Sequence, residues 1–424
     1  MEQNSPIHLR FAGRALPARE LAPPLVSIVV VNRNYGEFVG ATLDSISRQD
    51  YPWFECVVVD NASADESREV IERHTRDDPR FSTLYLDENI GQLRAALKVL
   101  DRLTGSFVSF VDADDALFTN YLSVHLQVHL ALPWSVGFTS NDVIETDRAG
   151  RVITSTRCYF GDGLRAEEAG LRAEATALRL STISDEDYRS LRDRVISVPH
   201  WRTGAGWAPG TANMYRRTLI DITRPDPQFC TGHAGCDGYF SSFIHIVAGS
   251  ALIFQPLSMY RHHARNISAF SPPLRAVSTL RTDSVTRARL QRRVVLRTLA
   301  AGAERFDRIL ATNRFWQTVD LLPGMEGSRS RDYFSDPNVQ TVLLETFEAL
   351  SAVFRPDGVL WALRERMGFH VWRTFVGKLR KQRRGVTIWA LLRVEARRSL
   401  RKLDALRTVN FLSARANRHR ISGR

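Results

Sequence analysis

Cysteine is scarce in this chain of 424 residues, and none of its four cysteines stands in a C-x-x-C pair. This scarcity excludes a disulfide-stabilised scaffold and predicts reduced thiols in a cytoplasmic protein. Long apolar runs are missing too: the longest, residues 25–31, has the length of a strand, whereas a bilayer span needs roughly 20 residues. Residues 1–24 carry scattered charges and no continuous apolar core, so we expect no secretory signal there.

The chain also lacks internal repeats, low-complexity tracts and a glycine-rich dinucleotide fingerprint. The loop after the first apolar run reads Val31-Asn32-Arg33-Asn34, without the glycines that a nucleotide-binding oxidoreductase needs. Hydrophobic residues make up 44% of the chain and charged residues 25%, which is typical of a globular protein with a core. The length favours two or three domains.

Positive charge is concentrated at the C-terminal end of the chain. The whole chain has a net charge of +12, yet residues 361–424 alone hold 18 lysines and arginines against three acidic residues. The cations of this basic tail alternate with the aromatic residues Trp361, Phe369, Trp372, Phe375 and Trp389. Rings beside cations suit the headgroup boundary of an anionic membrane, which we expect as the partner in preference to nucleic acid. There are three alternatives for this tail: it packs on the rest of the protein, it packs on a second subunit, or it is a solvated helix.

Strand-like and helix-like segments alternate between residues 25 and 115. Residues 25–31, 54–59, 81–86 and 107–111 are apolar and mostly β-branched or aromatic, as in strands buried on both faces of a parallel sheet. Residues 39–46, 63–74 and 89–103 have helical spacing, and Ser63 and Asp65 offer caps for the second of these helices. This alternation predicts an α/β sheet with right-handed crossovers.

The remaining sequence suggests four regions. We expect an N-terminal extension (1–24), an α/β domain (25–270), a helical region (271–360) and a basic amphipathic helical tail (361–424). A Ser-Pro-Pro sequence at 271–273 marks the linker after the α/β domain, and residues 166–194 are expected to contribute helices that lie over the sheet.

Carboxylates follow two of the predicted strands. Asp112, Asp114 and Asp115 come directly after the strand at 107–111, and Asp60 follows the strand at 54–59. Ligands of open α/β sheets bind beyond the carboxyl ends of the strands, so these side chains are expected to face one crevice. Oxygen ligands at positions i and i+2 suit Mg²⁺ or Mn²⁺ on a substrate phosphate. The alternative is that the acidic residues form turns and cap helices.

Residues 25–116 resemble the nucleotide-binding half of the family-2 glycosyltransferases, which are inverting enzymes with the GT-A fold. The matching segments are, in order, VSIVVVNRNYGEFVGATLDSISRQDYP, VVVDNASADES, ENIGQLRAAL and FVSFVDADD. Further on, PGTANMYRR (209–217), GCDGYF (235–240) and YRHHARNIS (260–268) resemble later motifs of the family. The resemblance covers residues 25–268 and implies a nucleotide-sugar-binding α/β domain.

The resemblance also implies roles for individual residues. Asp237 would be the catalytic general base. Contacts to the nucleotide and its sugar would come from Asn32, Asn34, Asp60, Gly91, Gln92 and Asp112. The metal, Mg²⁺ or Mn²⁺, would be held at Asp114, with His263 as a further contact to the metal or the diphosphate.

Three positions depart from the family pattern. Arg33 stands where the family usually has Tyr, Asn61 replaces a frequent second Asp, and Cys236 replaces the usual Glu before Asp237. The loss of this Glu affects acceptor recognition more than catalysis, because Asp237 is present.

The implied function is inverting, metal-assisted transfer of a hexosyl group from a UDP-sugar to a hydroxyl acceptor in cell-surface glycan or polysaccharide synthesis. A lipid-linked glycan is the expected acceptor, and the expected location is the cytoplasm, at the inner face of the cell membrane. Neither the sugar, the linkage nor the oligomeric state follows from the sequence. The alternatives are a DxD phosphatase, in which Thr or Val would stand at Ala116, and a non-catalytic membrane- or nucleic-acid-binding protein on a transferase-like domain.

Overall fold

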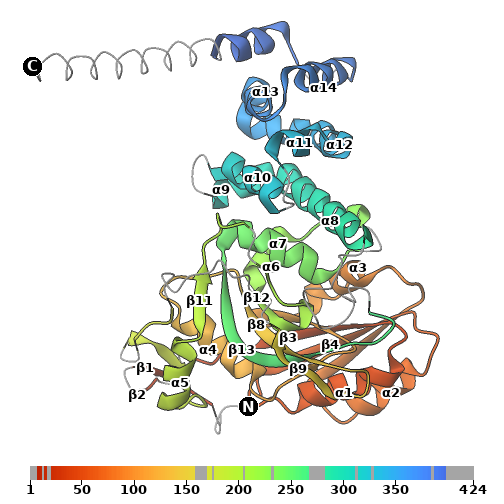
Figure 1. The fold of residues 1–424 in the computed structure, drawn as a ribbon, viewed down its shortest axis with the longest axis vertical. Helices are drawn as coiled ribbons and strands as arrows, with labels where there is room; N and C mark the ends of the chain where they lie inside the picture. The colour runs from red at the N-terminus through yellow and green to blue at the C-terminus, as the bar shows by residue number, and fades with distance from the viewer. Residues whose placement is uncertain are drawn as a thin grey trace, which may run out of the picture. The chain divides into compact units, whose positions relative to one another are not determined.

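The structure is a computed structural model that describes residues 7–11, 14–16, 21–157, 170–173, 176–203, 206–230, 234–266, 282–310, 314–325, 329–382 and 386–397 (Figure 1). The described residues fall into two compact units. The first lies within Met1–Thr298 and Met325–Gly327, and the second lies within Leu299–Gly324 and Ser328–Arg424.

The four apolar runs form parallel strands at one side of a mixed sheet in the first unit. The strands are β3 (Val26–Asn32), β4 (Phe54–Asn61), β5 (Phe81–Leu86) and β6 (Phe107–Asp112). Strand β3 pairs in parallel with β4 and β6, and β4 pairs with β5, so the order is β6-β3-β4-β5. In this register Asn32 lies opposite Asp60, and Val31 lies opposite Asp112. The predicted α/β sheet is therefore confirmed.

Strands from the second half of the domain extend the sheet beyond β6. They are β8 (Phe138–Thr146), β11 (Val195–Val198), β12 (Asn213–Arg216) and β13 (Ser250–Arg261). Strand β12 lies between β6 and β8 and is antiparallel to both. The long strand β13 runs parallel to β8 and, through Met259, pairs with Ala116 of the short strand β7 (Ala116–Leu117). This pairing brings the C-terminal end of β13 next to the acidic loop at 112–115.

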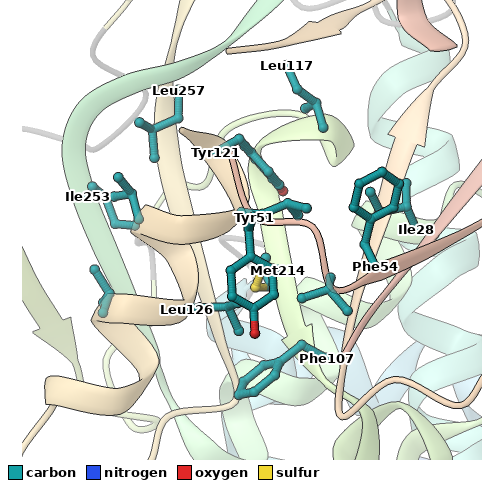
Figure 2. Close-up of a cluster of buried hydrophobic side chains, with 14 of the residues drawn as sticks. Ile28, Tyr51, Phe54, Phe107, Leu117, Tyr121, Leu126, Met214, Ile253 and Leu257 are labelled. Atoms are coloured by element: carbon teal, nitrogen blue, oxygen red, sulfur yellow. The ribbon is translucent and has the colours of Figure 1, made fainter. Parts of the chain in front are cut away.

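Helices cover both faces of the sheet. Helices α1 (Gly36–Ser47), α2 (Ser67–Thr75) and α4 (Tyr121–Ala131) pack into one large apolar cluster with strand side chains such as Ile28, Met214 and Ile253 (Figure 2). On the other face lie α3 (Gln92–Leu97), α6 (Arg217–Thr223) and α7 (Cys236–Ala248). There Phe240 of α7 stacks on Phe110 of β6, with ring centroids 5.4 Å apart. This two-sided burial explains why the parallel strands read as continuous apolar runs.

The helix predicted over residues 89–103 is shorter than expected. Helix α3 ends at Leu97 and a 3₁₀ turn, η1 (Leu100–Arg102), follows it. Its apolar face is nevertheless as predicted, because Leu93, Leu97, Leu100 and Leu103 are all buried. The shortening at the start has a local cause: residues 89–91 form a loop that binds the end of β4 instead of a helical turn.

A small antiparallel sheet joins the start of the chain to the region after β8. It contains β1 (Leu9–Phe11), β2 (Arg14–Ala15) and β10 (Leu178–Leu180), in the order β10-β1-β2. Strand β9 (Val152–Arg157) pairs with β8 in the main sheet, and α5 (Asp185–Arg192) follows β10. The prediction that residues 166–194 are helical therefore holds for α5 and was wrong for β10.

The second unit is helical, as predicted for the C-terminal region. The units divide within α8 (Thr282–Ala301). The helices that follow are α9 (Ala303–Ile309), α10 (Arg314–Met325), α11 (Ser330–Ser335), α12 (Pro337–Glu345), α13 (Phe347–Arg366) and α14 (Phe369–Lys381), and residues 388–397 are also helical. Within the described ranges, no helix is both long and apolar enough to cross a bilayer.

Candidate active site

The first part of the site lies where β3 and β4 end. The buried Asn32 side chain donates from Nδ2 to Asp60 Oδ1 at 2.9 Å. Ser63 donates its hydroxyl to the same oxygen at 2.6 Å, and its backbone N–H donates to Asp60 Oδ2 at 3.1 Å. Both carboxylate oxygens of Asp60 are thus held by neighbours, which fixes the orientation of this 5% exposed carboxylate at the end of its strand.

Asn34 ties the loop after β3 to the loop after β4. Its backbone N–H donates to Ser63 Oγ at 2.9 Å, and its side-chain oxygen accepts from the N–H of Ala64 at 2.7 Å. Its φ of 55° lies in the left-handed region, which Asn tolerates better than most residues. Ser63, predicted as a helix cap, therefore acts between two loops, and α2 begins four residues later at Ser67.

The loop before α3 is held by the next polar side chain of β4. Asn61 donates from Nδ2 to Asn89 Oδ1 at 2.9 Å and accepts from the N–H of Ile90 at 3.0 Å. Gly91 then turns the chain with a φ of 84°, a conformation that favours glycine. This turn places Gln92 in the first position of α3.

Gln92 connects the end of β6 to the start of α7. Its Nε2 donates to Asp112 Oδ1 at 2.6 Å, while its Oε1 accepts from the backbone N–H of Cys236 at 3.2 Å. The residue after Cys236 is Asp237, in the first turn of α7. A single side chain thus joins the acidic loop to the helix end that carries the predicted general base.

Asp112 and Asp237 both lie next to Gly210. A Cβ atom at Gly210 would lie 3.4 Å from Asp112 Oδ2 and 3.5 Å from Asp237 Cβ. Burial raises the pKa of Asp112 to about 8, aided by the negative charges of Asp114 and Asp237. Burial also raises the pKa of Asp237, while backbone N–H groups at the start of α7 act in the opposite direction. Ionisation of both carboxyl groups at once is therefore unfavourable until a cation or a hydrogen-bond donor binds beside them.

Asp114 lies against His263. His263 Nε2 is 2.8 Å from Asp114 Oδ2, and Asn266 Nδ2 donates to the same oxygen at 3.3 Å. The imidazole ring stacks on Phe38 with centroids 4.8 Å apart, and its side chain is 3% exposed. The ring is therefore fixed, with one nitrogen directed at the carboxylate.

Asp115 anchors the acidic loop to Thr211 and to the end of β13. Thr211 donates its hydroxyl to Asp115 Oδ2 at 2.6 Å and accepts from the N–H of Asp112 at 3.1 Å. The backbone N–H of Arg261 donates to Asp115 Oδ1 at 3.1 Å, and its Nε donates to the carbonyl of Asp114 at 2.9 Å. Burial and the charges of Asp114 and Asp112 raise the pKa of Asp115 well above its usual value. These bonds assign Asp115 to holding the loop, with Asp112 and Asp114 left for ligands.

Cations stand at the rim of the site. Arg265 donates from a terminal nitrogen to the carbonyl of Asn34 at 2.7 Å and lies 3.4 Å from Glu37. Arg148 pairs with the same Glu37 at 2.7 Å. The hydroxyl of Tyr35 donates to the carbonyl of Arg265 at 3.3 Å, and burial raises the pKa of this tyrosine. A guanidinium group is thus held next to the loop that contains Asn32 and Asn34.

The donor set suits a divalent cation only together with a substrate. Across the described ranges, no group of three or more His, Cys, Asp and Glu side chains is arranged as a complete metal site. Asp114 and His263 supply two donors, an oxygen and a nitrogen, that point at each other. Mg²⁺ and Mn²⁺ bound through one or two side chains take their remaining ligands from substrate phosphates and water. The residues present therefore fit a cation that arrives with a diphosphate.

The structure brings the predicted site residues together at one edge of the sheet. Asn32, Asn34 and Asp60 form one group, while Asp112, Gln92 and Asp237 form a second around Gly210. Asp114 and His263 form a third next to Asp112, and Gly91 contributes a backbone turn. The sequence assigned no supporting role to Thr211, Arg261, Arg265 and Asn266, and it placed Asp115 in the crevice, where the structure instead bonds it to Thr211 and Arg261. The YRHHARNIS motif contained three of these, so the motif itself was the available signal.

Comparisons with known proteins point to one family of enzymes. Residues 27–178 match the family model described as Glycosyl transferase family 2. A Bacillus subtilis glycosyltransferase assigned to teichuronic acid biosynthesis is 30% identical over 124 residues, which is 29% of this chain and 49% of that protein. A Campylobacter jejuni GalNAc(5)-diNAcBac-PP-undecaprenol beta-1,3-glucosyltransferase is 32% identical over 106 residues, or 24% of this chain and 34% of that protein. An uncharacterized glycosyltransferase of a Nostoc species is 32% identical over 245 residues, which is 57% of this chain and 66% of that protein. The chain thus spans less than two thirds of each of these relatives.

Solved structures are more distant. A fragment of S. aureus TarS in complex with UDP-GlcNAc has 16% sequence identity and a TM-score of 0.43, covering 84% of this chain and 92% of that one. The mannosyltransferase PcManGT from Pyrobaculum calidifontis, in complex with GDP-Man and Mn²⁺, has 16% identity and a TM-score of 0.40, covering 91% and 82%. Similarity at this level does not carry a substrate from one protein to another. The mostly parallel sheet flanked by helices is nonetheless GT-A-like.

Proposed function

We propose that this chain, whose residues 27–178 match the Glycosyl transferase family 2 model, transfers a sugar from a nucleoside diphosphate donor, a UDP-sugar, to a hydroxyl group with inversion. The observation that carries the proposal is the convergence of Asp60, Asp112, Asp114 and Asp237 at one edge of the sheet. Their spacing along that edge suits a ligand with a base, a ribose, a diphosphate and a sugar in series.

The nucleoside would bind along the ends of β4 and β6. Asp60, held by Asn32 and Ser63, offers a fixed acceptor for the N–H group of a base. Asn34 and Gly91 border the same loops and would enclose the base. Asp112, steadied by Gln92, would accept from a ribose hydroxyl. Such a hydrogen bond to an ionised carboxylate favours the charged form and would lower the raised pKa of Asp112.

The diphosphate would lie by Asp114 and His263, which would hold the cation described above. A bound Mg²⁺ or Mn²⁺ stabilises the negative charge that develops on a departing diphosphate. Asn266 and the fixed ring of His263 keep the Asp114 carboxylate in position. The neighbouring guanidinium of Arg265 adds positive charge at the open side of the site.

Asp237 would act as the general base. In the transfer step the acceptor hydroxyl oxygen forms a bond to the anomeric carbon, the bond from that carbon to the diphosphate oxygen breaks, and the hydroxyl proton passes to the Asp237 carboxylate. General-base catalysis of this kind contributes about 10²- to 10⁴-fold. Burial, which raises the pKa of Asp237, also makes it a better proton acceptor.

The acceptor is proposed from the names of the relatives. One of them is named for teichuronic acid biosynthesis and another for an undecaprenol-linked glycan, which supports a cell-surface glycan, lipid-linked during assembly, as the acceptor here. Cys236 precedes the general base and is buried, with a pKa raised by that burial. It therefore brings no charge to the acceptor side.

The test is a panel of nucleotide sugars assayed for hydrolysis and for thermal stabilisation, with Mn²⁺ or Mg²⁺ present and absent. We expect UDP-sugars to raise the unfolding temperature only with the cation present. Stabilisation by no nucleotide sugar, together with release of phosphate from small phosphomonoesters, would instead support the phosphatase alternative.

A further inference from the structure

The helix at residues 388–397 in the second unit has two apolar faces. Ala390 and Val394 are buried in the unit. On another side of the same helix, Ile388 is 62% exposed, Trp389 is 73% exposed and Leu392 is 54% exposed. Ile388 and Leu392 are four residues apart and therefore form one row, with Trp389 in the adjacent row. The described residues thus present a second apolar face, which is open.

Arginines extend the row that begins at Trp389. Arg393 and Arg397 follow it at intervals of four residues, so they lie along one edge of the exposed apolar face. The exposed side of this helix thus has an apolar strip of aromatic and aliphatic residues, and guanidinium groups lie along one edge of the strip.

These two arginines line a cavity. It has a volume of about 230 Å³ and is formed by Phe354, Arg355, Asp357 and Gly358 of α13 together with Arg393 and Arg397. The carboxylate of Asp357 lies 3.6 Å from Arg355 and 3.4 Å from Arg397. Two guanidinium groups thus pair with this carboxylate, and Arg393 is a third cation in the lining, so the lining holds more positive than negative charge.

The wall of the cavity contributed by α13 is conformationally unusual. Arg355 has a φ of 59° and a ψ of 151°, so the helix is interrupted just before Pro356. A non-glycine residue in this region is strained, and such strain is found most often where a side chain or a turn serves a ligand. The interruption leaves the Arg355 side chain 75% exposed at the cavity.

We propose that this cavity and the adjacent face of residues 388–397 dock on an anionic lipid surface. The cavity takes a headgroup phosphate, and Ile388, Trp389 and Leu392 enter the acyl boundary. A phosphate supplies further acceptors for these guanidinium groups, of which two already pair with Asp357. The apolar strip beside them suits a partner in which hydrocarbon lies next to the charge, as in a lipid. The surrounding sequence is positively charged, as binding to an anionic surface requires, because residues 361–424 hold 18 lysines and arginines against three acidic residues. The inference does not rest on the transferase reaction.

The test is co-sedimentation of the full chain with vesicles of phosphatidylcholine alone and of equal parts phosphatidylcholine and phosphatidylglycerol, at low and high salt. The variants are Trp389→Ser and the double change Arg393→Gln, Arg397→Gln. The control is Arg308→Gln, an exposed arginine of α9 whose loss removes one positive charge, half of the change in the double variant. Thermal unfolding of each variant checks that the fold is kept.

We expect binding to the anionic vesicles only. Removing one cation at a membrane surface weakens binding by about fivefold, so the double variant should lose more than tenfold while the Arg308 variant stays within twofold. Trp389→Ser should weaken binding at both salt concentrations, because its contribution is apolar. Equal binding to neutral vesicles, or equal loss in the Arg308 variant, would overturn the proposal. Displacement by soluble glycerol phosphate without any effect of Trp389→Ser would also overturn it, since the cavity would then bind a free phosphate.

Discussion

Gln92 and Asp112 are joined by a hydrogen bond of 2.6 Å, and the other end of the Gln92 side chain accepts from the backbone of Cys236. Gln92 therefore holds both Asp112, proposed to bind the sugar donor, and the start of α7, which carries the proposed general base Asp237. Without this side chain, neither the Asp112 carboxylate nor the first turn of α7 would keep that hydrogen-bond partner.

Replacing Gln92 by Leu should lower activity without unfolding the protein. The change keeps the approximate size but removes both hydrogen bonds, and a lost bond at a buried polar group costs about 1–3 kcal/mol. We expect kcat to fall by about tenfold to a hundredfold and the KM for the donor to rise less. Steady-state kinetics with thermal unfolding as the fold control measure this, and a kcat within twofold of the wild type would contradict it.

Replacing Asp114 by Asn should remove the metal-dependent part of UDP binding. The amide is nearly the same shape but lacks the charge that a divalent cation needs. Calorimetry with and without Mn²⁺ measures the difference, and Asp101→Asn, at an exposed ion pair with Arg224, is the matched control. If the wild type bound UDP equally well with and without metal, the assignment of Asp114 would be wrong.

Replacing Asp237 by Asn should preserve donor binding and abolish transfer. We expect a loss of about 10²-fold or more in kcat, because the amide cannot take the acceptor proton. Donor affinity by calorimetry is the internal control. Turnover at near the wild-type rate would mean that a different group takes the proton.

Replacing Gly210 by Ala separates stability from activity. The added Cβ would meet Asp112 and Asp237 at 3.4 and 3.5 Å, which are ordinary contact distances, so the free energy of unfolding should change little. The methyl group would nevertheless occupy space between the Asp112 carboxylate and the Cβ atom of Asp237, and we expect at least about a tenfold loss of kcat/KM, since small displacements of reacting groups are costly. Denaturant unfolding and kinetics on the same sample measure both quantities. A variant that is unfolded, or fully active, would refute this reading of Gly210.

The buried rings of His125 and His245 should lower stability as the pH falls through the range in which histidine titrates, an effect that the raised pKa of Asp112 opposes. Burial lowers the pKa of both His125 and His245 to about 4, from an ordinary value of 6.5. Above pH 6.5 both rings are neutral in the folded and in the unfolded protein, so they do not change the free energy of unfolding. Below it these two rings bind protons in the unfolded chain and not in the folded protein, so their contribution lowers stability down to about pH 4, by up to about 1.4 kcal/mol per pH unit for each ring.

A variant isolates one of these rings. His125 contacts Thr139 Oγ1 at 2.6 Å and Asn141 Oδ1 at 2.9 Å. His125→Gln should lower stability at pH 7 but make its dependence on pH less steep, as measured by urea unfolding between pH 7 and pH 5. Parallel pH profiles for the two proteins would show that His125 does not contribute.

The sequence predicted the parallel strands and the carboxylates at their ends because both signals are local. A β-branched run such as residues 26–31 needs only its own composition to be recognised, and Asp60 and Asp112 follow such runs directly. The contacts that support the acidic loop could not be predicted even though Arg261 lies in a family motif, because Thr211 and Arg261 reach Asp115 from 96 and 146 residues away. Ser63 illustrates a different limit: the same short hydroxyl that caps helices can also join two loops, and only the neighbouring Asn34 and Asp60 decide between these roles.

The position of β12 also has a consequence for biosynthesis. Strand β6, which leads into the acidic loop, has β3 on one side and, among the described residues, pairs on its other side with β12 alone, for example Ser109 with Met214. While the ribosome adds the intervening hundred residues, that edge has no native partner, and an unpaired apolar strand edge is a template for aggregation. A nascent chain that ends before residue 213 should therefore depend on a chaperone, and its release to a protease-resistant state should follow the emergence of β12 from the exit tunnel.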